Sequence, residues 1–185
     1  PHHLILTDDI IARDFDPLFK VNPPLRTQAD VLALREGLRD GTIDCIATDH
    51  APHAWQEKDG EFDLAPFGMV GLETALGVCI KALIDSGVLD WKTLIDCLTN
   101  RPSRAFNLAT GTIKTGAPAD IVVIDPTAKW TVGLDNLISK CKNSPFLGWE
   151  LQGVVSAAVV DGRLVHHTSG NYVPASLETS ARANR

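Results

Sequence analysis

The stretch Ile43-Asp44-Cys45-Ile46-Ala47-Thr48-Asp49-His50-Ala51-Pro52-His53 gives the strongest indication of fold in this chain. An apolar run ends in one carboxylate and two imidazoles, and the proline that follows fixes the backbone. We therefore predict a buried strand over residues 42–48 that delivers titratable groups to its carboxyl end. In a barrel of parallel strands, catalytic groups lie at that end.

Strand and helix signals alternate on both sides of this stretch. A helix is predicted between an N-cap at Thr27 and a C-cap at Gly41, with Asp30 completing an acidic variant of the capping box. The other predicted elements are a strand end over residues 3–7, a polar surface loop or lid over 54–64, a mostly apolar helix over about 72–86 and a short helix capped by Asp90.

The character of the sequence changes after residue 107. A short β-branched strand is predicted over residues 119–125, and a hairpin over 154–165 with Asp161-Gly162 at its turn. The predicted fold class is α/β: the closing part of a (β/α)8 TIM-type barrel over residues 1–107, then a small β-sandwich segment with a polar tail over 108–185. A whole barrel takes roughly 250 residues, so we expect this chain to be part of a larger fold.

Composition excludes two classes of function. The chain has 17 basic and 23 acidic residues, a net charge of −6, and neither sign forms a long block. A nucleic-acid binder would show a basic patch, so we expect no nucleic-acid partner. No apolar stretch approaches the length of a membrane span, so we expect no membrane partner and a cytoplasmic location. The four cysteines are scattered, which favours free thiols over disulfides or zinc ligands.

Asp49 is the first candidate for chemistry. A carboxylate beside a metal-bound hydroxide can take a proton and return it to the leaving nitrogen of an amide; the alternative is a loop aspartate that caps the next turn. Alternate residues of an extended segment point in opposite directions, so His50 is expected to hold a neighbouring backbone or carboxylate group. His53, beyond Pro52, is a candidate to bend back over the site, with an exposed loop histidine as the alternative.

Other polar residues have simpler interpretations when they are taken alone. Asn22 before Pro23-Pro24, and Phe67-Gly68 before the apolar helix, are typical of turns. Glu73 is expected to satisfy buried backbone or loop groups. Lys20 and Arg26, which flank Asn22, are interpreted as a solvated face, with steering of an anionic substrate as the alternative. His2-His3 are not favoured as metal ligands.

Four motifs together resemble the type I dihydroorotases of the metal-dependent amidohydrolase superfamily. They are Asn22–Arg26, Ile43–His53, Ala65–Thr74 and the Gly-x-Ile-x-x-Gly-x-x-Ala-Asp pattern that begins at Gly111. The last is shared by many amidohydrolases, whereas His53 separates the subfamilies better. The resemblance implies a (β/α)8 barrel with a side β-domain, one or two zinc ions, and interconversion of N-carbamoyl-L-aspartate and dihydroorotate in pyrimidine (UMP) synthesis.

Carried over by position, the resemblance implies a role for each candidate. Asp49 would be a metal ligand and the general base and acid, Asn22 and His53 would hold the substrate carboxylate, and Phe67 and Gly68 would line the ring site. The family's other metal ligands and its substrate-binding arginine are expected upstream of residue 1. Zinc takes about four ligands, so we expect these 185 residues alone to be inactive.

Two alternatives stay open. One is a non-catalytic dihydroorotase-like scaffold for another enzyme of the pathway, and the other is a sister cyclic amidase acting on hydantoins or allantoin. Beyond the small-molecule substrate, the partners expected from the resemblance are a second copy of the protein, as a homodimer, or aspartate transcarbamoylase.

Overall fold

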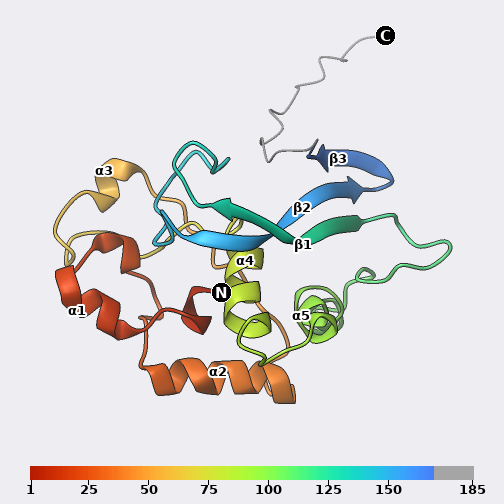
Figure 1. The fold of residues 1–185 in the computed structure, drawn as a ribbon, viewed down its shortest axis with the longest axis horizontal. Helices are drawn as coiled ribbons and strands as arrows, with labels where there is room; N and C mark the ends of the chain where they lie inside the picture. Colours follow the sequence, from red (N-terminus) through yellow and green to blue (C-terminus); the bar gives the residue numbers. More distant parts are fainter. Residues whose placement is uncertain (169–185) are drawn as a thin grey trace, which may run out of the picture.

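Helices form the first part of the chain and a β-sheet forms the last part (Figure 1). The computed structural model describes residues 1–168. Single 3-10 turns cover His2–Leu4, Asp8–Ile10 and Pro17–Phe19, and a π-helical stretch, Ile80–Ile84, continues α4. The helices are α1 (Ile11–Asp14), α2 (Gln28–Asp40), α3 (Trp55–Lys58), α4 (Ala75–Cys79), α5 (Trp91–Leu98) and α6 (Asn100–Ala105).

Helix α2 begins and ends where the sequence predicts. The Thr27 hydroxyl accepts a hydrogen bond from the Asp30 N–H at 3.4 Å, and the Asp30 carboxylate accepts one from the Thr27 N–H at 3.1 Å. These two bonds satisfy N–H groups that the first turn leaves without helical partners. Gly41 ends the helix with φ of 85°, a conformation that costs glycine little. Asp90 likewise caps α5 by accepting from the Thr93 N–H.

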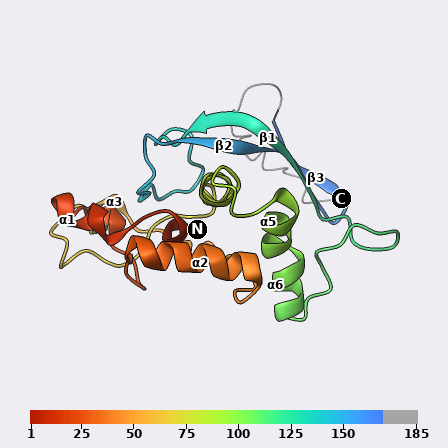
Figure 2. The ribbon, with the colours of Figure 1, turned by 60° about the horizontal axis from the view of Figure 1, so that its bottom comes forward.

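Helix α4 lies between the sheet and α2 (Figure 2). Its Cys79 and the following Ile80 belong to a core cluster with Leu38 of α2 and Leu94 of α5. Val78 of the same helix belongs to a second cluster. The other buried members of that cluster are Leu6, Val21, Leu25, Met69, Val132, Leu137, Phe146 and Leu151. The second cluster therefore joins segments from both ends of the described chain.

The sheet is antiparallel, in the order β1 (Ile121–Thr131), β2 (Glu150–Val160), β3 (Arg163–His167). The predicted hairpin is confirmed, with Asp161 and Gly162 at its turn. The strand predicted over residues 119–125 is confirmed from Ile121 onward, and β1 continues to Thr131 past a register shift.

Two predicted strands are wrong. Residues 3–7 begin in a 3-10 turn, and residues 42–48 form no strand, with a bend at 42–43 and no regular structure over 44–48. The side chains of residues 42–48 are half-buried or exposed rather than buried. A β-strand needs a neighbouring strand for its hydrogen bonds, and here the Ile43 and Ile46 N–H groups donate to Gly37 and Cys97 instead.

The described residues thus combine helices with one antiparallel sheet, which confirms the α/β content. Within residues 1–168, no helix is long and apolar enough to cross a membrane. All four cysteines are free, as predicted.

Candidate active site

Asp49 stands at the end of the extended stretch in a left-handed backbone conformation, with φ of 50°. For a residue other than glycine this conformation costs about 1–2 kcal/mol, and such strain is often found at functional sites. The Asp49 side chain is half-exposed, and its carboxylate makes no hydrogen bond to the described residues. It is therefore available to accept a proton from a bound molecule.

His2 is the imidazole nearest to this carboxylate. Its Nε2 atom lies 3.9 Å from Asp49 Oδ2, and its side chain is buried. Burial, as the largest cause, lowers the pKa of His2 to about 3, so the ring is neutral at physiological pH. The Nε2 atom has no hydrogen-bond partner among the described residues. His2 thus faces Asp49 without forming an ion pair with it.

The His50 ring binds backbone N–H groups, as its position in the stretch predicts. Its Nδ1 atom accepts hydrogen bonds from the N–H groups of Gly71 (3.1 Å) and Leu72 (3.3 Å). A Cβ atom at Gly71 would lie 2.5 Å from the Thr48 carbonyl oxygen, so only glycine allows this close approach. The end of the stretch is therefore fixed against the segment that leads into α4.

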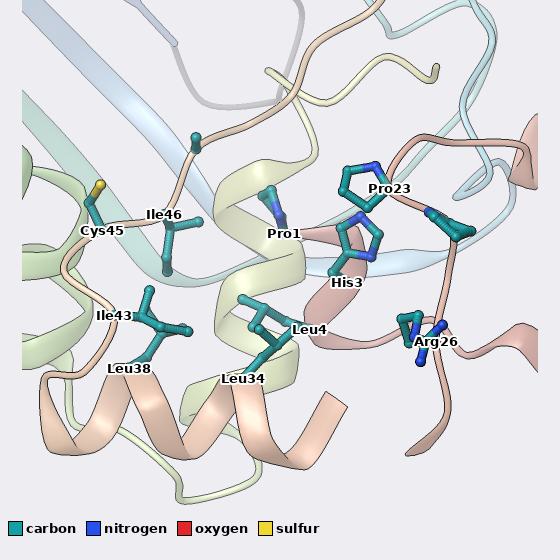
Figure 3. A pocket seen from close by; sticks show the side chains of 12 residues that line it. Pro1, His3, Leu4, Pro23, Arg26, Leu34, Leu38, Ile43, Cys45 and Ile46 are labelled. Carbon is teal, nitrogen blue, oxygen red and sulfur yellow. The ribbon is translucent and has the colours of Figure 1, made fainter. Parts of the chain in front are cut away.

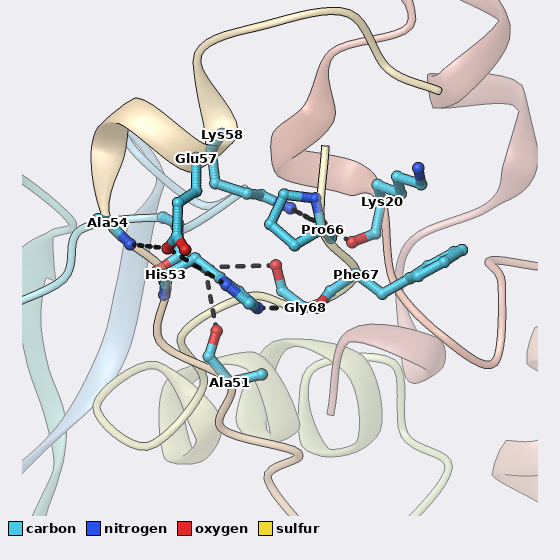
Figure 4. Close-up of polar contacts among 10 residues, drawn as sticks. Lys20, Ala51, His53, Ala54, Glu57, Lys58, Pro66, Phe67 and Gly68 are labelled. Carbon is cyan, nitrogen blue, oxygen red and sulfur yellow. Dashed lines mark hydrogen bonds and ion pairs between the residues drawn. The ribbon is translucent and has the colours of Figure 1, made fainter. Parts of the chain in front are cut away.

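His53 bends back toward Phe67, which brings two predicted site residues together (Figure 4). The His53 Nε2 atom lies 2.9 Å from the Phe67 carbonyl oxygen. A carbonyl oxygen can only accept, so Nε2 carries the proton. The Nδ1 atom lies 3.6 Å from the Glu57 carboxylate, which also accepts from the Ala54 N–H at 2.8 Å. Glu57 therefore contacts both the His53 ring and the backbone at the start of α3.

Gly68 packs directly under His53. Its φ is 130°, and a Cβ atom there would lie 2.6 Å from the Ala51 Cβ and 3.1 Å from His53 Nε2. The Gly68 N–H donates to the Lys20 carbonyl at 2.9 Å, two residues before Asn22. Asn22 itself is exposed, and its side chain makes no hydrogen bond to the described residues.

Asn143 connects these segments, although no sequence motif marks it. Its Oδ1 atom accepts from the His53 N–H at 3.1 Å, and its Nδ2 atom donates to the carbonyls of Ala51 (3.1 Å) and Gly68 (3.3 Å). The Asn143 side chain is fully buried. One amide thus holds the His53 and Gly68 backbones at a fixed separation.

We expect Asn143→Ala to lower the unfolding free energy by about 2–4 kcal/mol, because it leaves an N–H and two carbonyl groups without partners, and one such buried group costs about 1–3 kcal/mol. Chemical denaturation of the natural protein that carries this chain measures the change. Asn136→Ala, at a half-buried asparagine that bonds only the nearby backbone of Gly133 and Thr131, is the control and should cost less than half as much. Equal costs would contradict the connecting role of Asn143.

Glu73 also accepts hydrogen bonds from backbone N–H groups, as predicted. Its carboxylate accepts from the N–H groups of Ile138 (2.6 Å) and Ser139 (2.9 Å), shortly before Asn143. The interpretation of Lys20 as a solvated residue is wrong, because its side chain is buried and hydrogen-bonded to the carbonyls of Phe62 and Asp63.

Metal binding cannot be completed by the residues described here. No group of three or more His, Cys, Asp or Glu side chains within residues 1–168 is arranged to hold an ion. Asp49 with His2 beside it offers two donors, whereas zinc takes about four.

A cavity of about 370 Å³ opens beside α2 and residues 43–47 (Figure 3). Its lining is mostly apolar and includes Leu34 of α2, Ile43 and Cys45. None of the predicted site residues lines it. It is therefore distinct from the cluster around His53.

Solved structures define the class of the fold. The L-hydantoinase (dihydropyrimidinase) from Arthrobacter aurescens matches 94% of this chain with a TM-score of 0.84 and 28% sequence identity, over 40% of its own length. The D-hydantoinase (dihydropyrimidinase) from Thermus sp. matches 94% of the chain with a TM-score of 0.82 and 26% identity, over 39% of its length. The fold is that of part of a hydantoinase-type α/β protein.

The sequence then identifies the family. Residues 20–165 match the model of the amidohydrolase family, and the chain belongs to that family. It is 51% identical over 166 residues to the dihydroorotase of Geotalea daltonii and 52% identical over 167 residues to that of Anaeromyxobacter sp. (strain K). Each match covers 90% of this chain. The chain spans only 39% and 38% of the lengths of these two curated relatives.

Proposed function

We propose that this chain is part of a dihydroorotase, which interconverts N-carbamoyl-L-aspartate and dihydroorotate in pyrimidine synthesis. The observation that supports the proposal best is the contact of His53, four residues after Asp49, with Phe67 and Gly68. We also propose that residues 1–107 belong to the closing part of a (β/α)8 barrel and residues 108–185 to a small β-domain, in a cytoplasmic protein.

Asp49 is the general base and acid in this proposal. Its carboxylate accepts the proton of the attacking water and returns it to the ring nitrogen as the amide bond breaks. One or two zinc ions belong to the proposal as cofactors, with Asp49 as the ligand supplied by this chain. The described residues do not complete a zinc site, so no step of the mechanism is assigned to the metal.

His53 and Asn22 hold the substrate carboxylate. The His53 Nε2–H group now donates to the Phe67 carbonyl, and a carboxylate is a stronger acceptor that can replace it. The Glu57 carboxylate lies 3.6 Å from Nδ1, the other nitrogen of the same ring. The Asn22 side chain is exposed and offers two further donors. The backbone of Phe67 and Gly68 then meets the ring.

We expect His53→Ala to raise KM for dihydroorotate about 10- to 100-fold, because a hydrogen bond to a charged group contributes roughly 1.5–3 kcal/mol. The value of kcat should change less. Steady-state kinetics of the natural protein measures both constants. His167→Ala, at an exposed histidine of β3, is the control and should leave KM unchanged. An unchanged KM in His53→Ala would remove His53 from the substrate site.

A sister cyclic amidase is the second candidate, because hydantoinases share this fold with TM-scores above 0.8. The higher sequence identity to dihydroorotases, 51% against 28%, favours dihydroorotase. Ring opening of dihydroorotate and of hydantoin by the natural protein decides between them. We expect dihydroorotate to be preferred at least about tenfold in kcat/KM; a preference for hydantoin would overturn the assignment.

If the protein is a non-catalytic scaffold, it should turn over neither dihydroorotate nor hydantoin. Association as a homodimer or with aspartate transcarbamoylase is part of the proposal, supported by the family resemblance. Mass measurement of the native complex tests it.

A further inference from the structure

Two lysines with buried side chains lie beside the His53 cluster. Lys20 follows the 3-10 turn Pro17–Phe19, and Lys58 is the last residue of α3. Their exposed fractions are 8% and 4%. Lysine is almost never this deeply buried unless it is paired. Neither ammonium group forms an ion pair with a carboxylate of the described residues, so both use backbone carbonyl oxygens instead.

Three of the carbonyl groups they bind, those of Phe62, Asp63 and Pro66, belong to the segment before Gly68. Lys58 Nζ donates to the Pro66 carbonyl at 2.9 Å (Figure 4). Lys20 Nζ donates to the carbonyls of Phe62 (2.8 Å) and Asp63 (3.0 Å). The same Nζ lies 4.6 Å from the centre of the Phe67 ring, within cation–π range.

The Lys20 backbone completes the connection. Its carbonyl oxygen accepts from the Gly68 N–H at 2.9 Å and from Lys58 Nζ at 3.5 Å. Asn22 lies two residues further along the same chain segment. The two lysines therefore fix the Phe67–Gly68 backbone against the segment that carries Asn22.

Overall stability does not explain this arrangement. Burial, the nearby charge of Lys20 and, in the opposite direction, Asp16 together bring the pKa of Lys58 down to about 8. Because this pKa is below that of an unfolded lysine, folding disfavours the charged form at neutral pH. An apolar side chain of similar length would fill the space without that cost. An apolar side chain could not hydrogen-bond the carbonyl groups, whereas an ammonium group has three donors that can.

We propose that Lys58 and Lys20 are positioning residues that hold the ring-binding backbone of Phe67 and Gly68 in a fixed place relative to Asn22. The effect on substrate rests on the proposed function. The lysines do not touch the reacting atoms, so they act through the Phe67–Gly68 segment.

Lys58→Met in the natural protein is the decisive variant, compared with Lys58→Arg and with Lys92→Met. Lys92 is an exposed lysine of α5 that pairs with Asp96, so its substitution is a matched control. In Lys58→Met we expect amide hydrogen exchange over residues 59–68 to be about tenfold faster. We also expect KM for dihydroorotate to rise about tenfold with kcat within threefold. Lys58→Arg should restore most of both, and Lys92→Met should change neither.

Unchanged exchange over residues 59–68, or faster exchange with an unchanged KM, would overturn the proposal. Lys20→Met tests the same segment from its other side, and loss of folding in both methionine variants would assign the lysines to overall stability instead. If the wild-type protein does not act on dihydroorotate, the proposed function fails, whereas the exchange rates still support or overturn the holding of the segment.

Discussion

Asp49→Asn is expected to lower kcat of the natural protein by about 10²- to 10⁴-fold, which is the usual contribution of a general acid–base group. The amide cannot accept the proton that the carboxylate takes. The fold should persist, because asparagine adopts the left-handed conformation found at this position, φ of 50°, more readily than most residues do. Turnover of dihydroorotate and the thermal unfolding midpoint measure the two effects separately.

Asp44→Asn provides the matched control for this variant. Asp44 is an exposed carboxylate of the same extended stretch, five residues before Asp49. Its substitution should leave kcat within about twofold, since surface changes of this kind seldom exceed 0.5 kcal/mol. Near-normal turnover in Asp49→Asn would show that another group moves the proton.

Gly68→Ala should raise KM for dihydroorotate about 10- to 100-fold. The new Cβ would lie 2.6 Å from the Ala51 Cβ, closer than carbon atoms pack, and φ of 130° is strained for alanine. Overpacking of this kind typically costs about 1–3 kcal/mol. The segment must shift away from His53, which displaces the Phe67 carbonyl as well. Steady-state kinetics measures KM, and denaturation measures any loss of stability.

Gly60→Ala is the control that distinguishes the steric effect at Gly68 from the effect of replacing any glycine of this segment. Gly60 lies in the same segment, and a Cβ there would meet no atom within 4 Å. We expect it to leave KM unchanged. Equal effects of the two substitutions would mean that flexibility of the segment, rather than the close packing at Gly68, governs binding.

The parts of the fold that depend on neighbouring residues could be predicted from sequence. Thr27 with Asp30, and Asp90 with Thr93, form caps within three residues, and Asp161-Gly162 forms its turn locally. The same holds for His50, because the alternation of an extended chain indicates which side chains face backbone. For His53 the sequence indicates only a bend back after Pro52; the Phe67 carbonyl that its ring meets, 14 residues further on, comes from the structure.

The parts that depend on distant residues could not be predicted. Residues 42–48 have the composition of a strand, but strand formation needs a partner that the described residues do not provide. Lys20 looks like a surface charge until Phe62 and Asp63, more than 40 residues away, are seen to accept from it. Asn143 has no neighbouring motif, and its role exists only because three separate backbone groups converge on it.

The long sequence separation between His53 and Asn143 also determines when their hydrogen bond can form during protein synthesis. The hydrogen bond between them joins residues 90 positions apart. A ribosome adds about 5–20 residues per second, so the Asn143 amide emerges roughly 5–20 s after His53. During that interval the His53 and Gly68 backbones lack their common partner. The His53 and Gly68 backbones therefore reach their final positions only after the connection between β1 and β2 has left the ribosome.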